Sequence, residues 1–170
     1  MGLSQKGFSI ATSARLGGAD INRLLGVTVP DGLLDGSSAF DIVFQAGEGV
    51  ALNIASDLDG LVVGLPPPFN KAREQRESLD IDLRISDALS IDATYSTNLS
   101  LAIAQDTEDT WRALASIGAV RPELTLDDVD AGTTVISGRL EELDISAWAD
   151  TQARFRSCLL YTSPSPRDIS

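Results

Sequence analysis

The chain contains no histidine and one cysteine among its 170 residues. Serine-hydrolase triads and histidine metal sites therefore lack their usual member. The sequence also has no nucleotide-binding P-loop, no dinucleotide-binding glycine motif and no G-x-S-x-G nucleophile motif. Carboxylates are the only common catalytic groups left. We predict that the protein is not an enzyme and that it uses no cofactor or metal ion.

Basic residues are also scarce, with 13 Lys and Arg against 25 Asp and Glu, which gives a net charge of −12. Nucleic acid is not expected as a partner, because neutralising phosphates requires clustered Lys and Arg. The same charge disfavours adhesion to anionic lipid headgroups, so contact with lipid is expected through an apolar surface. No apolar run approaches the roughly 20 residues that span a bilayer as a helix, and no signal peptide is recognisable.

The last part of the chain, residues 157–170, is predicted to be disordered and separate from a single folded domain of residues 1–156. Residues 157–168 look like a translated sequencing adapter. A natural Ser/Pro-rich tail would give the same structural prediction. Cys158 lies in this segment, so the folded domain is expected to have no disulfide, zinc-thiolate or cysteine-nucleophile chemistry.

Alternation of apolar and polar residues predicts β-strands along most of the chain. The first strand alternates from Phe8 to Ala14, and residues 110–123 are interpreted as a strand leading to a loop, although helical spacing also fits. Short turns between consecutive strands favour antiparallel pairing. We therefore predict a mainly β fold, an antiparallel meander. The apolar positions of the intervening strands are Phe40, Ile42, Phe44, Val50, Leu52, Ile54, Leu79, Ile81, Leu83, Ile85, Leu89, Ile91, Leu99, Leu101 and Ile103.

Two short capping helices are predicted, near residues 20–25 and 144–150. Asp20 and Asp144 precede short apolar stripes as N-caps, and Gly26 follows the first stripe as a C-cap. The two regions also align with each other at a constant offset of 124 residues. This alignment indicates a weak internal repeat, and a coincidence between two strand-to-helix corners explains it equally well.

Four polar clusters in the sequence are candidate sites. Asp80 and Asp82 are spaced like the paired acids of glycosidases, but a solvated strand face explains them better. Residues 57–60 and 128–132 resemble fragments of calcium loops, and ordinary Asp/Gly turns explain both. Residues 71–77 mix both charge signs and are predicted to form an exposed loop.

The most specific pattern runs from Ser56 to Lys71, where an apolar strand is predicted to end at Leu65 before three consecutive prolines. Prolines have no backbone N–H, so the chain must leave the sheet there. This stretch and residues 137–148 resemble the AsmA-like periplasmic proteins of Gram-negative bacteria, in particular their YhdP-like members. The resemblance covers roughly residues 7–155, although Phe69 stands where the family more often has leucine. The motif positions are Gly60, Leu65, Pro66, Pro68, Lys71, Asp144 and Trp148.

The resemblance implies a curved, partly open sheet whose apolar face forms a groove for phospholipid acyl chains. The groove would be lined by the apolar strand positions named above, from Phe40 to Ile103. It also implies a fragment of an inner-membrane-anchored protein that spans the periplasm and moves phospholipid between the inner and outer membranes of the cell envelope. The anchor, the targeting segment and the contacts with membrane components would then belong to missing parts of a longer parent chain.

The strand pattern alone favours a different arrangement. One-sided aliphatic strands usually close against a second sheet as a sandwich core. A structural or interaction β-sandwich module of an extracytoplasmic protein is therefore the alternative function. A carbohydrate-active β enzyme is a minor third one. The two main hypotheses differ in one observable: whether the apolar strand faces are open or sealed.

Overall fold

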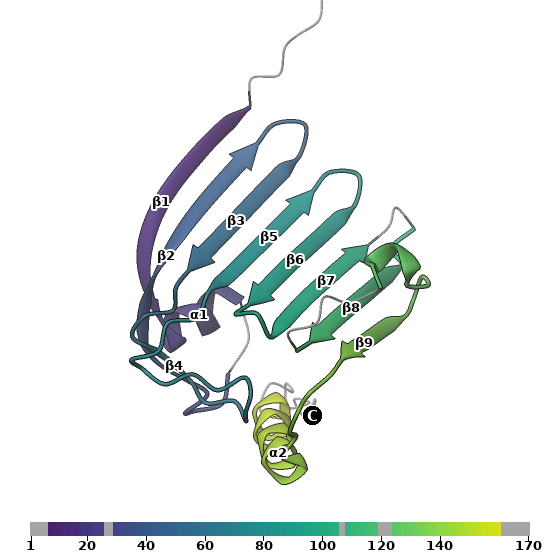
Figure 1. The fold of residues 1–170 in the computed structure, drawn as a ribbon. Coiled ribbons are helices and arrows are strands. Elements are labelled where there is room, and N and C mark those ends of the chain that lie inside the picture. Colours follow the sequence, from purple (N-terminus) through teal and green to yellow (C-terminus); the bar gives the residue numbers. More distant parts are fainter. Residues whose placement is uncertain (1–6, 26–28, 106–107, 119–123, 161–170) are drawn as a thin grey trace, which may run out of the picture.

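In the computed structural model, described for residues 7–25, 29–105, 108–118 and 124–160, the chain forms one β-sheet with helices at one end (Figure 1). The described strands are β1 (Phe8–Gly17), β2 (Leu34–Ala46), β3 (Val50–Ser56), β4 (Leu61–Val63), β5 (Leu79–Ile85), β6 (Leu89–Tyr95), β7 (Leu99–Gln105), β8 (Trp111–Ile117) and β9 (Thr134–Gly138). The described helices are α1 (Gly18–Leu25), the 3-10 helix η1 (Leu126–Asp128) and α2 (Ile145–Leu160).

The strand order is β1-β2-β3-β5-β6-β7-β8-β9, and β4 pairs with the start of β2. Neighbouring strands are antiparallel except for β8 and β9, which are parallel. The predicted mainly β, antiparallel and open sheet is therefore confirmed, as is the strand assigned to residues 111–117. The parallel pair was not predicted. It arises because the chain crosses over between β8 and β9, as parallel neighbours require. The loop predicted around Pro122 lies outside the described residues.

The register places the predicted apolar positions on one face of the sheet. Residues directly opposite each other on paired strands point to the same face, and the pairings carry one row of apolar side chains across the sheet. The polar positions of the same strands, such as Asp82 opposite Asn53 and Asp92, fall on the other face. The apolar row contains Ile10, Phe44, Leu52, Leu83, Ile91 and Ile103.

The buried core lies at one end of this apolar face. Figure 1 shows α1, β4 and α2 gathered at that end. The core consists of Phe40, Leu58 and Leu61. Half-buried side chains from α1 and five strands pack around them: Leu16, Ile21, Leu34, Ile42, Ile54, Leu79 and Tyr95. Among the described residues no second sheet packs on the apolar face, so the closed sandwich core kept as the alternative is not formed in this part of the chain.

The two predicted helices are present with different bounds. Helix α1 begins at Gly18, so Asp20 lies in its first turn. The Asp20 carboxylate accepts a hydrogen bond from the Gly17 N–H at 3.0 Å. Asp20 is therefore not the N-cap, and Gly26 lies outside the described residues. Helix α2 does begin after Asp144, whose Oδ1 accepts from the Ala147 N–H at 3.0 Å. The N-cap predicted there is confirmed.

Helix α2 continues to Leu160 rather than ending near residue 150. Its extension is rich in residues that favour helix, such as Ala153 and Arg154. The last residues of α2 therefore belong to the segment assigned to the tail, and residues 161–170 lie outside the described residues. The two halves of the weak internal repeat are β1 with α1 and β9 with α2, which stand at opposite edges of the sheet.

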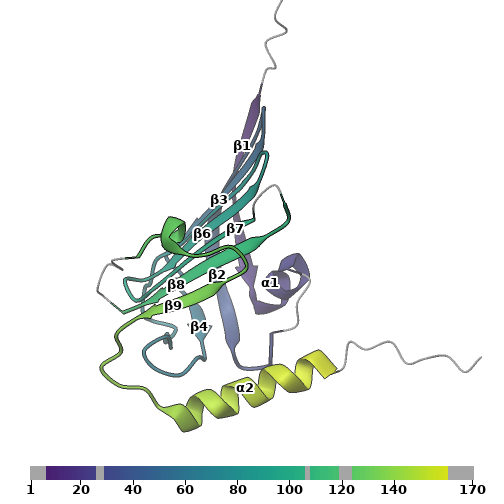
Figure 2. The ribbon, with the colours of Figure 1, turned by 90° about the vertical axis from the view of Figure 1, so that its right-hand side faces the viewer.

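The crossover between β8 and β9 covers part of the polar face. Leu114 on β8 and Val129 after η1 are both buried, and Leu126 of η1 lies beside Ser116. Figure 2 shows the short green coil of η1 and helix α1 on opposite sides of the sheet. The helical elements thus leave much of the apolar face uncovered, at the end distant from α1.

Candidate functional site: an open apolar face and a pocket beside helix α2

The apolar face is exposed at the end of the sheet distant from α1. Five large apolar side chains on this face are 44–70% exposed in the structure. Large exposed apolar side chains on one face of a sheet are typical of an interaction surface. Four of them lie toward this end: Phe8, Ile10, Ile85 and Trp111. The fifth, Ile136 on the edge strand β9, shares a row with Ile54 and Ile42, nearer the core.

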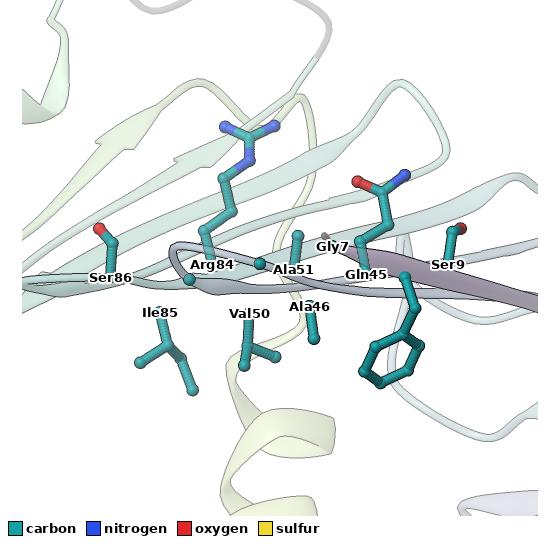
Figure 3. A pocket seen from close by; sticks show the side chains of 12 residues that line it. Gly7, Ser9, Gln45, Ala46, Val50, Ala51, Arg84, Ile85 and Ser86 are labelled. Carbon is teal, nitrogen blue, oxygen red and sulfur yellow. The ribbon is translucent and has the colours of Figure 1, made fainter. Parts of the chain in front are cut away.

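Figure 3 shows how sharply the two faces differ at this end. Ile85, Val50 and Ala46 lie on one side of the sheet, and Arg84 and Gln45 lie on the other. A hollow of about 530 Å³ runs along the ends of these strands. Its lining comes from both faces of the sheet. The hollow therefore follows the hairpin end of the sheet, where the β2–β3 and β5–β6 turns lie, rather than the apolar face.

All fifteen predicted groove residues lie on the apolar face, but they differ in accessibility. Phe40 is 4% exposed and belongs to the core, so it cannot contact a ligand in this conformation. Ile42, Ile54 and Leu79 pack against that core from partly buried positions. The remaining positions, from Phe44 on β2 to Ile103 on β7, are half-buried except for exposed Ile85. They form an apolar surface with protein on one side only.

The proline loop closes on itself. Strand β4 ends at Val63 rather than at Leu65. The backbone of Val63 then pairs with that of Lys71 in both directions, at 3.0 and 2.9 Å. Between them the prolines make no ladder, as expected from their missing N–H groups, and Phe69 is 5% exposed. The prediction that the chain leaves the sheet at the prolines is confirmed.

Lys71 was predicted to lie in an exposed loop, and this prediction is wrong. The side chain is 1% exposed, and its Nζ donates hydrogen bonds to the Leu61 carbonyl at 2.7 Å and the Ala72 carbonyl at 3.1 Å. Burial lowers the pKa of the Lys71 ammonium below 10.5, and the carboxylates of Asp59 and Glu77 partly oppose this shift. Lys71 therefore joins β4 to the end of the proline loop.

Gly60 occupies a position that only glycine fits well. It has φ of +84°, and a Cβ at the neighbouring Gly36 would lie 2.3 Å from the Gly60 carbonyl oxygen. The two backbones can approach because neither residue has a side chain. The contact holds the turn before β4 against the start of β2, so the motif glycine has a structural role.

A second apolar site lies beside helix α2, a pocket of about 670 Å³. This volume is in the range of ordinary small-molecule sites. Trp148 contacts Phe69 of the proline loop edge to face, with ring centroids 5.8 Å apart. Its indole Nε1 is buried and has no hydrogen-bond partner among the described residues. The main apolar lining consists of Phe69, Ile117, Leu143, Ile145, Trp148 and Phe155.

The pocket adjoins the apolar face of the sheet. Ile117 lines the pocket and lies opposite Leu99 on that face. The Tyr95 hydroxyl, also on that side, donates to the Phe69 carbonyl at 3.3 Å, and burial raises the pKa of Tyr95, with Glu77 adding to the shift. Sequence reasoning missed this pocket. Trp148 and Phe69 were noted only as motif positions, and nothing in their spacing indicates that they meet.

The acidic clusters are structural. Asp82 lies on the polar face and accepts from the Asn53 amide at 3.2 Å. The Asp57 carboxylate accepts from the Asp59 N–H at 3.1 Å, as in an Asx-turn. Hydrogen bonds from Thr125 lower the pKa of Asp128, which caps η1. Within the described residues, no group of three or more acidic, His or Cys side chains is placed to hold a metal ion.

Nearly all the exposed large apolar side chains belong to one of the two sites. Among the described residues nine are exposed: five are on the sheet face, three line the α2 pocket, and only Leu124 lies elsewhere. The fold and these sites define a one-layer open β-sheet with a one-sided apolar surface. Comparison with family models, curated proteins and solved structures finds no match for this chain. Across the described part of the chain, no helix is both long and apolar enough to cross a membrane.

Proposed function

We propose that this chain is a segment of a phospholipid carrier that holds acyl chains on the open apolar face of its sheet. In this proposal the parent protein is AsmA-like and YhdP-like. It is anchored in the inner membrane and spans the periplasm, and it moves phospholipid between the inner and outer membranes. In this proposal the chain provides a binding surface for acyl chains and catalyses no reaction.

One observation carries the proposal: an apolar face runs across the sheet, and among the described residues no layer covers it at the end distant from α1. The row from Ile10 to Ile103 is continuous by register, and side chains at both ends of that region, such as Ile10 and Trp111, are 55% and 44% exposed. A protein domain normally buries such a face. Its exposure supports a partner that is itself apolar.

The energetics suit a lipid chain. Exposing a chain of about sixteen carbons to water costs on the order of 12 kcal/mol, at about 0.8 kcal/mol per methylene. An apolar trough lowers this barrier without chemistry. Aliphatic side chains attract an acyl chain without directional contacts. An acyl chain could therefore move along the face without breaking specific hydrogen bonds. The acidic opposite face keeps the segment in water.

The proposal can be tested by native mass spectrometry after the protein is incubated with phospholipid vesicles. We expect bound phospholipid, and we expect Ile81→Asp to reduce its occupancy because this change places a carboxylate on the apolar face. The matched control is Ser90→Asp, which puts the same group on the polar face opposite Arg84. The control should bind as the unchanged protein does.

The stability of Ile81→Asp distinguishes an open surface from a core. Ile81 is half-buried, so water can reach the new carboxylate, and the folding penalty should stay below the several kcal/mol expected for a sealed site. Outright unfolding of this variant would mean that Ile81 belongs to a closed core. Absence of phospholipid from the unchanged protein, or equal occupancy in both variants, would refute the proposed function.

A further inference from the structure

We infer that the α2 pocket encloses one acyl chain of a phospholipid whose headgroup is zwitterionic, with an ammonium group. This inference rests on the proposed function and extends it, because it assigns a second binding place and a headgroup class. The pocket is defined by Phe69, Ile117, Leu143, Ile145, Trp148 and Phe155. Its occupant follows from its lining, its continuity with the sheet and the charges around it.

The lining and the position of the pocket indicate an acyl chain. Leu143 and Ile145 are 51% and 75% exposed although they line a cavity of about 670 Å³. The start of helix α2 and the residue two positions before it thus present apolar side chains to an unfilled space. Ile117 belongs to both the pocket and the apolar face. A chain on the sheet can therefore extend into the pocket without crossing a polar surface.

The charges beside the pocket select the headgroup. Glu141, Glu142 and Asp144 alternate in sequence with lining residues, and Asp150 follows another, Ala149; all four are exposed. Among the side chains that the structure describes, two exposed guanidinium groups, of Arg139 and Arg154, flank the same stretch. The carboxylates outnumber the guanidinium groups, so they attract an ammonium and repel a headgroup that carries only negative charge.

Two tryptophans allow the two sites to be tested separately, because the chain has only Trp111 and Trp148. Trp111→Phe leaves a reporter in the pocket, and Trp148→Phe leaves one at the open end of the sheet. The probe is a pair of lysophospholipids with the same brominated acyl chain, which quenches tryptophan on contact. One has an ethanolamine headgroup and the other a glycerol headgroup.

We expect both probes to quench Trp111. The ethanolamine probe should quench Trp148 at about three- to tenfold lower concentration than the glycerol probe, a difference that exposed charges can supply and that high salt should reduce. In Trp111→Phe, the added changes Glu141→Gln and Glu142→Gln should remove this preference. The matched control, Glu48→Gln with Asp87→Asn in the distant hairpin turns, should leave it unchanged.

A pocket-filling change adds an independent test. In the Trp111→Phe background, Ala149→Phe projects a ring from α2 into the cavity and should abolish quenching of Trp148. The same change in the Trp148→Phe background should leave quenching of Trp111 intact. If Ala149→Phe does not fold, the glutamate variants decide the question alone, because their side chains are exposed.

The outcomes separate the inference from the proposed function. Quenching of Trp111 without quenching of Trp148 would overturn the pocket and leave the sheet proposal standing. Equal affinity for the two headgroups, or a preference that survives the glutamate changes, would overturn the headgroup selection. Absence of quenching at both tryptophans would refute the proposed function together with the inference.

Discussion

Replacing the buried lysine with methionine, Lys71→Met, tests the packing of the proline loop against β4. Methionine keeps a similar length and volume but cannot donate to the carbonyls of Leu61 and Ala72. Those bonds are 2.7 and 3.1 Å long, and the lysine is 1% exposed. The change therefore removes a charged donor from two acceptors in an interior position.

The magnitude follows from two opposing terms. Leaving a buried acceptor without its donor costs about 1–3 kcal/mol for each group. Removing a buried ammonium relieves part of its desolvation penalty. We expect a net loss of about 2 kcal/mol in the free energy of unfolding at neutral pH. Lys71→Ala should lose about 4 kcal/mol, because truncation of the long side chain adds a cavity.

The pH dependence has a definite sign. Burial lowers the pKa of Lys71 below 10.5 in the folded protein, so between that lowered value and 10.5 the unfolded chain binds more protons. The free energy of unfolding must then rise with pH through this window. Tyr95 acts oppositely at higher pH, because its raised pKa makes the unfolded chain lose the phenolic proton first above pH 10.0. The lysine contribution is therefore measured as the difference between the wild type and Lys71→Met, because both proteins contain Tyr95.

Urea unfolding of the wild-type protein and of Lys71→Met, repeated from neutral pH to pH 10.5, measures both effects. The wild-type protein should gain stability relative to Lys71→Met as the pH rises. The matched control is Arg73→Met, an exposed residue of the same loop whose ion pair with Asp35 contributes at most about 1 kcal/mol. A Lys71→Met protein as stable as the wild type, or a stability difference independent of pH, would refute the burial of this ammonium.

Three further predictions concern the same end of the molecule. Phe69→Ala should cost about 3 kcal/mol by opening a cavity and should weaken the near-ultraviolet circular dichroism of Trp148, because the indole loses its ring contact; an unchanged thermal midpoint would contradict the burial of Phe69. Replacing Pro66–Pro68 with alanine should lower hydrogen-exchange protection at Val63 and Lys71 while leaving distant strands intact, and unchanged protection would show that the prolines are a passive connector. Asp144→Ala should reduce the helical circular dichroism signal at neutral pH. In the wild-type protein, hydrogen bonds from the Ala147 N–H and the Ser146 hydroxyl lower the pKa of Asp144, so this contribution should be lost as the pH falls through that lowered value; equal helicity in variant and wild type would contradict the cap.

The sequence by itself determined the strands and their faces. A pleated strand alternates its side chains with a period of two residues, so the pattern from Leu79 to Ile85 already separates aliphatic positions from Asp80 and Asp82. Short turns then left antiparallel neighbours as the simplest arrangement. The N-cap at Asp144 was predictable for the same reason, because a cap depends on residues within one helical turn.

Only the tertiary structure decided which parts of that sheet are covered. The burial of Lys71 depends on the Leu61 carbonyl across a loop closed by Val63, and its charged sequence neighbours gave no sign of it. The pocket beside α2 likewise depends on contacts between Phe69 and Trp148, far apart in the chain. Local pattern fixes the direction in which a side chain points, whereas its exposure depends on what the rest of the chain places over it. The apolar face was therefore predictable, and its opening at one end and enclosure at the other were not.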